Sequence, residues 1–590
     1  MRVCDYIAER LYEEGVRQVY GLVGGGTAGL NDGIFAHKHL EFVCFHHEQG
    51  AGHAAVGAAR TNGKLAVVNV TTGCGGTNVM TSLLNAWQEN MPVLFLSGNT
   101  RLNNMARTIN KERGLELRRY GVQEHDIVTT VQNMTKYATI IESVNDVAQV
   151  FDYALHHAKS GRPGPVWIDV PADIQAAPMP VEYKRHLFAG LSFDADREIA
   201  AAMDVFKAAK RPLIVAGAGI SISDSQFLFR GFVESHQIPF VTTFLTKDII
   251  ETDNPLNVGM IGIKGNRAAN FAMQNSDCLL IVGSSMNVTH IGYDAKSFSP
   301  HSTRIMVDID NSELYKDIIR VDHKIRCDAG EFLNTAYPLV KGIDTDAWAD
   351  KCLHWKEKRP IYRPEVHRPD TGGLNLYEIC ESMNRHMQAK DTVIVDAGQP
   401  CYIWSTNGKY PAGSRYMAQA AQGDMGYAIP AVVGIHKTDP SLNLLAVIGE
   451  GSFMSNVQEL ATIAHHQIPV KIFVINNDGY MSIKQTQNKL FGGRQHGVSQ
   501  STGVNFPDIE KIAAAFGIDY INIRNNDELD YYMEKCMRAE KPFIVEFWSQ
   551  HELDVQPAQA VHEDGTQGGL HDMSPFLSEQ ELEDEMIVKI

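Results

Sequence analysis

Two apolar runs that flank a glycine-rich turn constrain the fold of this chain more than any other feature. Residues 444–480 read LLAVIGEGSFMSNVQELATIAHHQIPVKIFVINNDGY. Leu444–Ile448 and Val470–Ile475 have the length and composition of buried strands, and the apolar spacing over 457–464 predicts a helix between them. A strand, a crossover helix and a second strand form a βαβ unit, whose strands are parallel. We therefore expect an open α/β sheet here.

Polar residues follow both predicted strands. Gly449-Glu450-Gly451-Ser452 comes after the first strand and Asn476-Asn477 after the second. Because the carboxyl ends of parallel strands share one edge, and ligands of open α/β sheets bind there, Glu450 and Asn477 should lie together. A carboxylate and a carboxamide beside a helix N-terminus suit Mg²⁺ that carries a phosphate or diphosphate. The alternative is an ordinary βαβ unit with a glycine turn.

Short apolar strands alternate with helical segments along most of the chain, which predicts three doubly wound α/β domains. We place them at 1–175, 193–345 and 371–552, with an acidic tail or lid at 553–590. The Pro-rich segment 171–184 and the polar segment 346–370 are the expected linkers. The strands expected in the first two domains are Gln18–Leu22, Phe42–Phe45, Leu65–Val70, Pro92–Leu96, Pro165–Val170, Leu213–Ala216, Cys278–Val282 and Arg304–Ile309.

Charge and cysteine usage exclude several classes of function. The formal net charge of −17 argues against nucleic acid or an anionic membrane as partner. The nine cysteines form no CxxC pair, so neither a zinc site nor a disulfide framework is expected. This cysteine usage indicates a reducing cytoplasm. The charged, amphipathic N-terminus is unlike a signal peptide, and no apolar run is long enough for a membrane span.

The pattern GEGS followed by NN resembles the thiamine-diphosphate (ThDP) signature, which is usually GDG and NN. The three domains likewise resemble the pyrimidine-binding, central and diphosphate-binding domains of ThDP-dependent decarboxylases and acetohydroxyacid (acetolactate) synthases. The resemblance implies that Mg²⁺ is bound by Glu450, Asn477 and the carbonyl of Gly479. Glu450 replaces the usual Asp, which adds a methylene group between the backbone and the carboxylate.

Glu48 is the principal catalytic candidate, in the segment FHHEQGAGHAA. The resemblance implies that it binds N1′ of the coenzyme's aminopyrimidine. A carboxyl in an apolar pocket shares a proton with that nitrogen and so favours the imino tautomer, whose 4′-nitrogen is the base. The alternative is a first-turn glutamate stabilised by the helix dipole. His47 and His53 beside it are either functional or packed locally.

Further segments resemble cofactor-contacting parts of the same family. VDAGQ implies diphosphate contacts by Gly398 and Gln399, and QGDMGYAIP implies that Met425 is the apolar wedge beneath the coenzyme rather than core filler. TTGCGGTN resembles the segment under the pyrimidine ring, with Cys74, expected to be a buried, inert thiol, where proline is usual. Additional coenzyme contacts are expected at Gly25, Thr72, Gly451, Ser452 and Tyr480.

YGVQEHD resembles the acetohydroxyacid synthase segment that contains AFQE. Gln123 then matches an active-site glutamine supplied by the partner subunit, and Val122 replaces a phenylalanine, which would enlarge the substrate pocket. A surface glutamine is the alternative.

The central domain resembles flavin-binding domains only in part. Its segments imply FAD contacts, although GSSMNVTHIGY lacks the usual Arg-rich flavin segment and is closer to enzymes of polysaccharide and nucleotide-sugar pathways, such as yersiniose-type branching enzymes. An empty or ADP-binding domain is the alternative. The expected flavin contacts are Gly217, Gly219, Leu245, Gly262, Ile263, Lys264, Asp308 and Asp328.

The resemblance implies decarboxylation of a 2-keto acid, most simply pyruvate, and transfer of the two-carbon unit to a second carbonyl. Pyruvate as acceptor gives acetolactate, and a keto-sugar nucleotide gives a branched sugar. Simple decarboxylation, carbon–carbon hydrolysis and a non-catalytic cofactor-binding regulator remain as alternatives. A homodimer or homotetramer is implied, with Glu48 and Glu450 meeting across chains.

Overall fold

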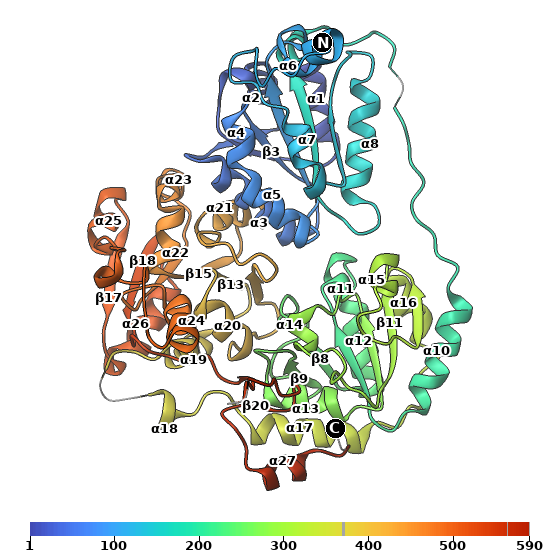
Figure 1. Ribbon diagram of the computed structural model, residues 1–590, viewed down its shortest axis with the longest axis vertical. Coiled ribbons are helices and arrows are strands. Elements are labelled where there is room, and N and C mark those ends of the chain that lie inside the picture. The colour runs from blue at the N-terminus through green and yellow to red at the C-terminus, as the bar shows by residue number, and fades with distance from the viewer. Residues whose placement is uncertain (184, 369–371, 563–564, 589–590) are drawn as a thin grey trace.

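The computed structural model describes residues 1–183, 185–368, 372–562 and 565–588. Within these residues lie three six-stranded parallel sheets surrounded by helices, which confirms the predicted fold class (Figure 1). Most of their strands are buried apolar runs, as expected of parallel sheets covered on both faces, while β5, β12 and β17 are partly exposed. The predicted bounds at residues 184, 370, 371 and 590 lie outside the described residues.

The N-terminal sheet has the order β2-β1-β3-β4-β6-β5. Four-residue β5 is mostly half-buried and lacks the continuous apolar run of its neighbours, so it was not predicted. The strands of this sheet are β1 (Gln18–Gly21), β2 (Glu41–Cys44), β3 (Ala66–Val70), β4 (Val93–Asn99), β5 (Tyr137–Ile140) and β6 (Val166–Pro171). The helices are α1 (Val3–Glu13), η1 (Gly25–Thr27), α2 (Ala28–Ala36), α3 (Glu48–Asn62), α4 (Cys74–Asn78), α5 (Met80–Gln88), η2 (Leu102–Asn104), α6 (Ala106–Arg113), α7 (Ile127–Val131), η3 (Gln132–Met134), α8 (Val147–Lys159) and α9 (Ala172–Ala176).

The central sheet has the order β12-β11-β10-β7-β8-β9. The strand order reverses between β10 and β7, the place where open α/β sheets bind ligands. Its strands are β7 (Pro212–Ala216), β8 (Phe240–Thr242), β9 (Asn257–Met260), β10 (Cys278–Val282), β11 (Thr303–Asp308) and β12 (His323–Arg326). Its helices are α10 (Asp196–Ala208), α11 (Gly219–Ile222), α12 (Gln226–His236), α13 (Arg267–Asn275), α14 (Val288–Ile291), α15 (Asn311–Tyr315), α16 (Ala329–Ala336) and α17 (Asp346–Lys358).

The third sheet has the order β14-β13-β15-β16-β18-β17 and contains the predicted βαβ unit. The helix expected over 457–464 is broken into η4 and α23, and a further short helix, α22, precedes them. The strands are β13 (Asp391–Val395), β14 (Arg415–Ala418), β15 (Asn443–Gly449), β16 (Lys471–Asn476), β17 (Asp519–Ile523) and β18 (Phe543–Trp548). The helices are α18 (Pro364–His367), α19 (Leu376–His386), α20 (Gln399–Thr406), α21 (Ala428–Thr438), α22 (Glu450–Ser455), η4 (Val457–Glu459), α23 (Leu460–His465), α24 (Met481–Phe491), η5 (Gln500–Thr502), α25 (Ile509–Phe516) and α26 (Asn526–Met537).

Helices α3 and α21 join the first and third domains (Figure 1). Small residues let the two backbones approach closely, since a Cβ on Gly434 would lie 1.8 Å from the Ala54 carbonyl oxygen. A Cβ on Gly57 would likewise lie 2.7 Å from the Ala431 carbonyl oxygen. One apolar core runs through both domains at this contact, which places α3 between the two sheets.

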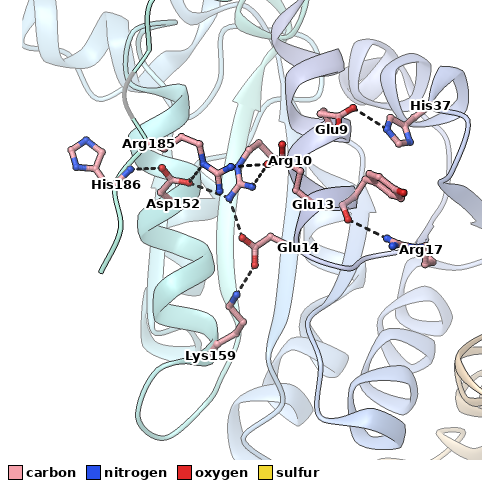
Figure 2. A network of polar contacts seen from close by, with 11 residues as sticks. Glu9, Arg10, Glu13, Glu14, Arg17, His37, Asp152, Lys159, Arg185 and His186 are labelled. Atoms are coloured by element: carbon pink, nitrogen blue, oxygen red, sulfur yellow. Dashed lines mark hydrogen bonds and ion pairs between the residues drawn. The ribbon is translucent and has the colours of Figure 1, made fainter. Parts of the chain in front are cut away.

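A cluster of charges fixes the first linker to the N-terminal domain (Figure 2). Arg10 of α1 is buried and pairs with Glu13, Glu14 and Asp152. Arg185 donates to Glu13 at 2.8 Å, and the backbone N–H of the next residue donates to Asp152 at 2.7 Å. The chain therefore remains attached to the N-terminal domain just after the predicted linker 171–184, beyond the predicted boundary at 175.

Two predictions about the later segments are corrected. Residues 346–358 form α17 instead of a linker, because its charges surround two tryptophans, Trp348 and Trp355, that pack into the central core. The predicted tail packs against the central domain as a strap (residues 553–562 and 565–588), with the elements β19 (Ala558–Gln559), β20 (Met573–Ser574) and α27 (Glu579–Glu585). Buried Glu585 accepts from the Trp355 indole at 2.8 Å and pairs with Lys358.

None of the helices in the described part of the chain combines the length and apolarity needed to cross a membrane.

Candidate active site

The carboxyl edge of β15 and β16 brings the predicted metal ligands together. The strands are parallel, as expected, and Glu450 begins α22 directly after β15. Oε1 of buried Glu450 accepts from the backbone N–H groups of Asn477 at 3.2 Å and Gly479 at 2.7 Å. A Cβ on Gly479 would lie 2.2 Å from the Val498 carbonyl oxygen, so this turn requires glycine.

The spacing of these groups fits a small oxygen-binding cation. One terminal atom of the Asn477 carboxamide lies 2.8 Å from the Gly479 carbonyl oxygen and 3.2 Å from Glu450 Oε1. Whether this atom is the nitrogen or the oxygen of the carboxamide depends on its partners. Without a cation it is the nitrogen, which donates to both oxygens. Beside a cation it would be the oxygen, which completes a set of three oxygen ligands. Adjacent ligands of octahedral Mg²⁺, at about 2.1 Å from the ion, lie about 3 Å apart.

Electrostatics at this edge also favour a cation. Burial raises the pKa of Glu450 to about 7, because the ionised carboxylate is removed from water. A divalent cation would supply the missing positive charge. No group of three or more His, Cys, Asp or Glu side chains in the described residues is placed to hold a metal. The candidate set instead has one carboxylate, one carboxamide and one carbonyl.

Five other residues of the third domain that are predicted to contact the coenzyme lie around the same edge. Gly451 and buried Ser452 continue α22, and the Tyr480 ring packs over Gly451. Gly398 is the N-cap of α20, and a Cβ added to it would lie 3.6 Å from the Ser482 hydroxyl, near the start of α24. Gln399 is buried, and its side-chain nitrogen donates to the Leu553 carbonyl at 2.6 Å, so its amide is turned toward the strap.

The loop that carries Met425 is held by buried polar side chains, while Met425 itself is 41% exposed. Asp396, at the end of β13, accepts from the backbone N–H groups of Gly426 at 3.0 Å and Ala428 at 2.8 Å. Asn456 donates to the Gly426 carbonyl at 2.9 Å. The arrangement fixes the backbone after Met425 and leaves its side chain free to contact a ligand.

Glu48 is the first residue of α3 and is 4% exposed. Its Oε2 accepts from the Asn78 carboxamide at 3.0 Å, and its Oε1 would lie 3.3 Å from a Cβ on Gly75. The structure therefore brings Glu48 to the predicted pyrimidine segment 71–78. Glu459 of the third domain accepts from the backbone N–H of His47 at 3.0 Å, which fixes the start of α3.

Most other N-terminal candidates meet at the same segment. Gly25 is exposed on a turn that packs against Thr71 and Thr72, and the Thr72 hydroxyl donates to the Gly98 carbonyl at 2.9 Å. Gln123 is exposed, and its carbonyl oxygen would lie 2.2 Å from a Cβ on Gly73. Cys74 is exposed, which corrects the expectation of a buried thiol, because α4 buries the following glycines instead.

A cavity of about 420 Å³ lies at the strand-order reversal of the central sheet. Four of the predicted flavin contacts line it: Gly219, Leu245, Asp308 and Asp328. Burial raises the pKa of Asp308 to about 6. Gly217 packs under the cavity against Gly283.

Three other predicted flavin contacts do not line this cavity. The Ile263 N–H donates to the Thr289 carbonyl of α14 at 2.9 Å, and the Ile263 carbonyl accepts from the strap residue Gln559 at 2.8 Å. A Cβ on Gly262 would lie 2.0 Å from the Thr289 carbonyl, and Lys264 donates to a strap carbonyl. The chain itself thus covers 262–264, so the predicted set fits a flavin only in part.

Four residues that the sequence did not single out support the site: Asn78, Glu89, Asp396 and Glu459. Asn78 and Asp396 lie inside the motifs TTGCGGTN and VDAGQ, so their place in these motifs could have identified them as site residues. Glu89 accepts from the backbone N–H groups of Ala420 at 2.9 Å and Ala421 at 3.0 Å. No local pattern points to Glu89 or Glu459, because their partners lie in another domain.

Comparisons with known proteins agree with this arrangement. Residues 1–129 match the family described as thiamine pyrophosphate enzyme, N-terminal TPP binding domain. Residues 199–335 match the central domain, and residues 396–547 match the C-terminal TPP binding domain, of thiamine pyrophosphate enzymes. The chain belongs to the ThDP-dependent enzymes.

Within these enzymes the chain is acetolactate synthase-like. It is 29% identical over 567 residues to the acetolactate synthase large subunit of Lactococcus lactis, which covers 95% of this chain and 94% of that protein. It is 28% identical over 558 residues to the acetolactate synthase isozyme 1 large subunit of Escherichia coli, with 94% and 95% covered. A probable acetolactate synthase large subunit of Methanocaldococcus jannaschii is 28% identical over 575 residues, with 95% and 93% covered.

Proposed function

We propose that the chain decarboxylates a 2-keto acid, with pyruvate as the first candidate, and joins the two-carbon unit to a second carbonyl compound. The observation that carries the proposal is the buried carboxyl of Glu48 beside the predicted pyrimidine segment. ThDP, when bound, would supply a nucleophilic carbon that adds to the keto carbonyl and a positively charged thiazolium ring that takes up the electron pair freed as carbon dioxide leaves. The names of the relatives support acetolactate as the product.

Glu48 holds a proton at the pyrimidine nitrogen in this proposal. The Asn78 carboxamide occupies Oε2, which leaves Oε1 to share a proton with a ligand nitrogen. Burial keeps water from competing for that proton, so the carboxyl favours the imino tautomer of the coenzyme. Asn78 fixes the rotamer of Glu48, and Glu459 fixes the backbone that precedes it.

The third domain holds the diphosphate end. Glu450, Asn477 and the Gly479 carbonyl would bind Mg²⁺, and Met425 would support the bent coenzyme from below. Residues around the diphosphate would be Gly398, Gln399, Gly451, Ser452 and Tyr480, with Gly25 and Thr72 near the pyrimidine. We infer that a cytoplasmic homodimer or homotetramer completes the site, with Glu48 of one chain facing Glu450 of another and Gln123 reaching the substrate.

The reaction makes a stoichiometric prediction. With ThDP, Mg²⁺ and pyruvate alone, each carbon dioxide released should be accompanied by one acetolactate and the loss of two pyruvates. Quantifying pyruvate, carbon dioxide and acetolactate in one reaction tests this. Acetaldehyde in place of acetolactate would indicate a simple decarboxylase, and no carbon dioxide release with any 2-keto acid would overturn the proposal.

A keto-sugar nucleotide is the second candidate acceptor. Val122 stands where the resembling segment has phenylalanine, and it is 80% exposed beside Gln123. A smaller side chain there favours a bulkier acceptor. Adding candidate ketones to the pyruvate reaction would then divert the two-carbon unit into a branched product at the expense of acetolactate.

FAD is the first candidate for the central cavity, held by Gly217, Gly219, Leu245, Asp308 and Asp328. Residues 262–264 are covered by α14 and the strap, so they are not open to a ligand. The structure therefore supports a site for the nucleotide end of FAD more than one for its flavin ring. The purified protein should therefore show the visible absorption of a flavin, and denaturation should release it. A colourless protein that binds ADP would replace this prediction with a flavin-free nucleotide site.

A further inference from the structure

The Met425 loop (residues 419–427) is fastened to the N-terminal domain as well as to its own domain. Glu89 at the end of α5 accepts two backbone N–H groups from the start of the loop. Arg60 of α3 pairs with Glu89 and donates to the Ala418 carbonyl. These contacts fix the loop's entry, while Asp396 fixes its exit.

Asp424, directly before Met425, makes the contacts closest to the predicted wedge. Its Oδ2 lies 3.1 Å from Nε2 of His53, and its Oδ1 accepts from the Asn85 carboxamide at 3.4 Å. The His53 side chain is fully buried and the Asp424 side chain is 8% exposed. The Tyr427 ring packs edge-on against His53, with the two ring centroids 5.5 Å apart. The sequence alone indicates no role for Asp424 and leaves that of His53 open.

The protonation states suit a donor–acceptor pair. Burial lowers the pKa of His53 to about 3 and raises the pKa of Asp424 to about 6. The negative charge of Glu89 also raises the pKa of Asp424, and Asp396 is the other carboxyl group nearby. Near neutral pH the imidazole is therefore neutral and the carboxylate is ionised. Oδ2 of Asp424 accepts no hydrogen bond from the described residues as placed, and it lies 3.1 Å from Nε2 of His53, within reach of an Nε2–H donor.

We propose that Asp424 is a positioning residue, which fixes the Met425 loop to helix α3 through His53 and to helix α5 through Asn85. This inference rests on the proposed function, in which Met425 supports the coenzyme and Glu48 holds its pyrimidine. Helix α3 begins at Glu48 and contains His53, so one helix sets the position of both groups. In the proposed dimer Glu48 serves the partner's coenzyme, so α3 also ties the two active sites together.

A purely structural role does not account for an aspartate here. The loop and the residue after it already donate four backbone hydrogen bonds to Glu89 and Asp396, which hold the two ends of the loop, so Asp424 adds a fixed point between them. Burying a carboxylate beside a neutral histidine gives little net stability, since desolvation offsets the interaction. Its effect is to hold Met425 at one place, and displacements of about 1 Å at an active site cost about 10²-fold in rate.

The test compares Asp424→Ala and Asp424→Asn with Glu41→Gln. Glu41 pairs with Lys437 of α21 and so joins the same two domains away from the loop. Asp424→Ala should lower kcat about 10- to 100-fold with KM for the 2-keto acid nearly unchanged. Asp424→Asn keeps one acceptor oxygen and should recover part of that loss, and Glu41→Gln should behave as the wild type.

Amide hydrogen exchange of peptides covering 419–427, without coenzyme, supplies a readout that does not depend on activity. Exchange there should rise in Asp424→Ala and in His53→Ala, and not in Glu41→Gln. Exchange and kcat of Asp424→Ala equal to the wild type would overturn the positioning role. A wild type that consumes no 2-keto acid would overturn the proposed function instead, while the exchange result would still decide whether Asp424 fixes the loop.

Discussion

Replacing Glu48 by glutamine is expected to remove nearly all 2-keto acid turnover while ThDP still binds. Glutamine preserves the shape of the side chain and its contact with Asn78, but its amide cannot give a proton to the pyrimidine nitrogen or take one from it. General acid–base groups typically contribute about 10²- to 10⁴-fold, so kcat should fall by that range. Coenzyme affinity, measured by tryptophan fluorescence, should change little, because the diphosphate and metal contacts lie in another domain.

Two companion variants sharpen this prediction. Asn78→Ala frees one oxygen of Glu48 and should lower kcat less than Glu48→Gln does, with the protein still folded. Glu142→Gln removes an exposed carboxylate from the same domain and should leave kcat unchanged. Pyruvate consumption by Glu48→Gln at the wild-type rate would remove Glu48 from the mechanism and, with it, the basis of the proposed function.

The meeting of the candidate metal ligands at one sheet edge was predictable because its signal is local. Two buried apolar runs, the polar residues after each, and the rule that parallel strands share an edge suffice to place Glu450 beside Asn477. The observed pairing of Gly449 with Ile475 puts both polar turns at that edge. The position of Glu48 at the start of a helix was also predictable locally, because it directly follows the apolar run Phe42–Phe45 that forms a strand and its short connection.

The supports of the site could not be read from the sequence, because each joins residues that are distant in the chain. Glu89 binds a loop more than 300 residues later, and His53 meets Asp424 across a domain contact. The short strands β5 and β12 were missed because they are partly exposed and lack a continuous apolar run. The sequence of 346–358 predicts a linker because its charged residues outnumber the two tryptophans that the fold buries.

Replacing Glu450 by glutamine should remove Mg²⁺-dependent ThDP binding without weakening the metal-free protein. The neutral amide keeps one acceptor oxygen for the Asn477 and Gly479 N–H groups. It also avoids the cost of burying a carboxylate, the cost that raises the pKa of Glu450 to about 7. Metal affinity should fall by more than about 100-fold, since even supporting residues of metal sites contribute about 10- to 100-fold. Titrating ThDP at fixed Mg²⁺ measures this loss.

Thermal unfolding separates the two effects. Ligand that binds the folded state at about 100 times its Kd stabilises it by about 2.7 kcal/mol, so Mg²⁺ and ThDP together should raise the Tm of the wild type and not of Glu450→Gln. Asp478→Asn is the matched control, because it removes an exposed carboxylate one residue from Asn477 and asparagine tolerates its positive φ. If Glu450→Gln kept the wild-type Tm increase, the three oxygens at the β15–β16 edge would not be the metal site, because the charge that binds the cation would then come from another residue.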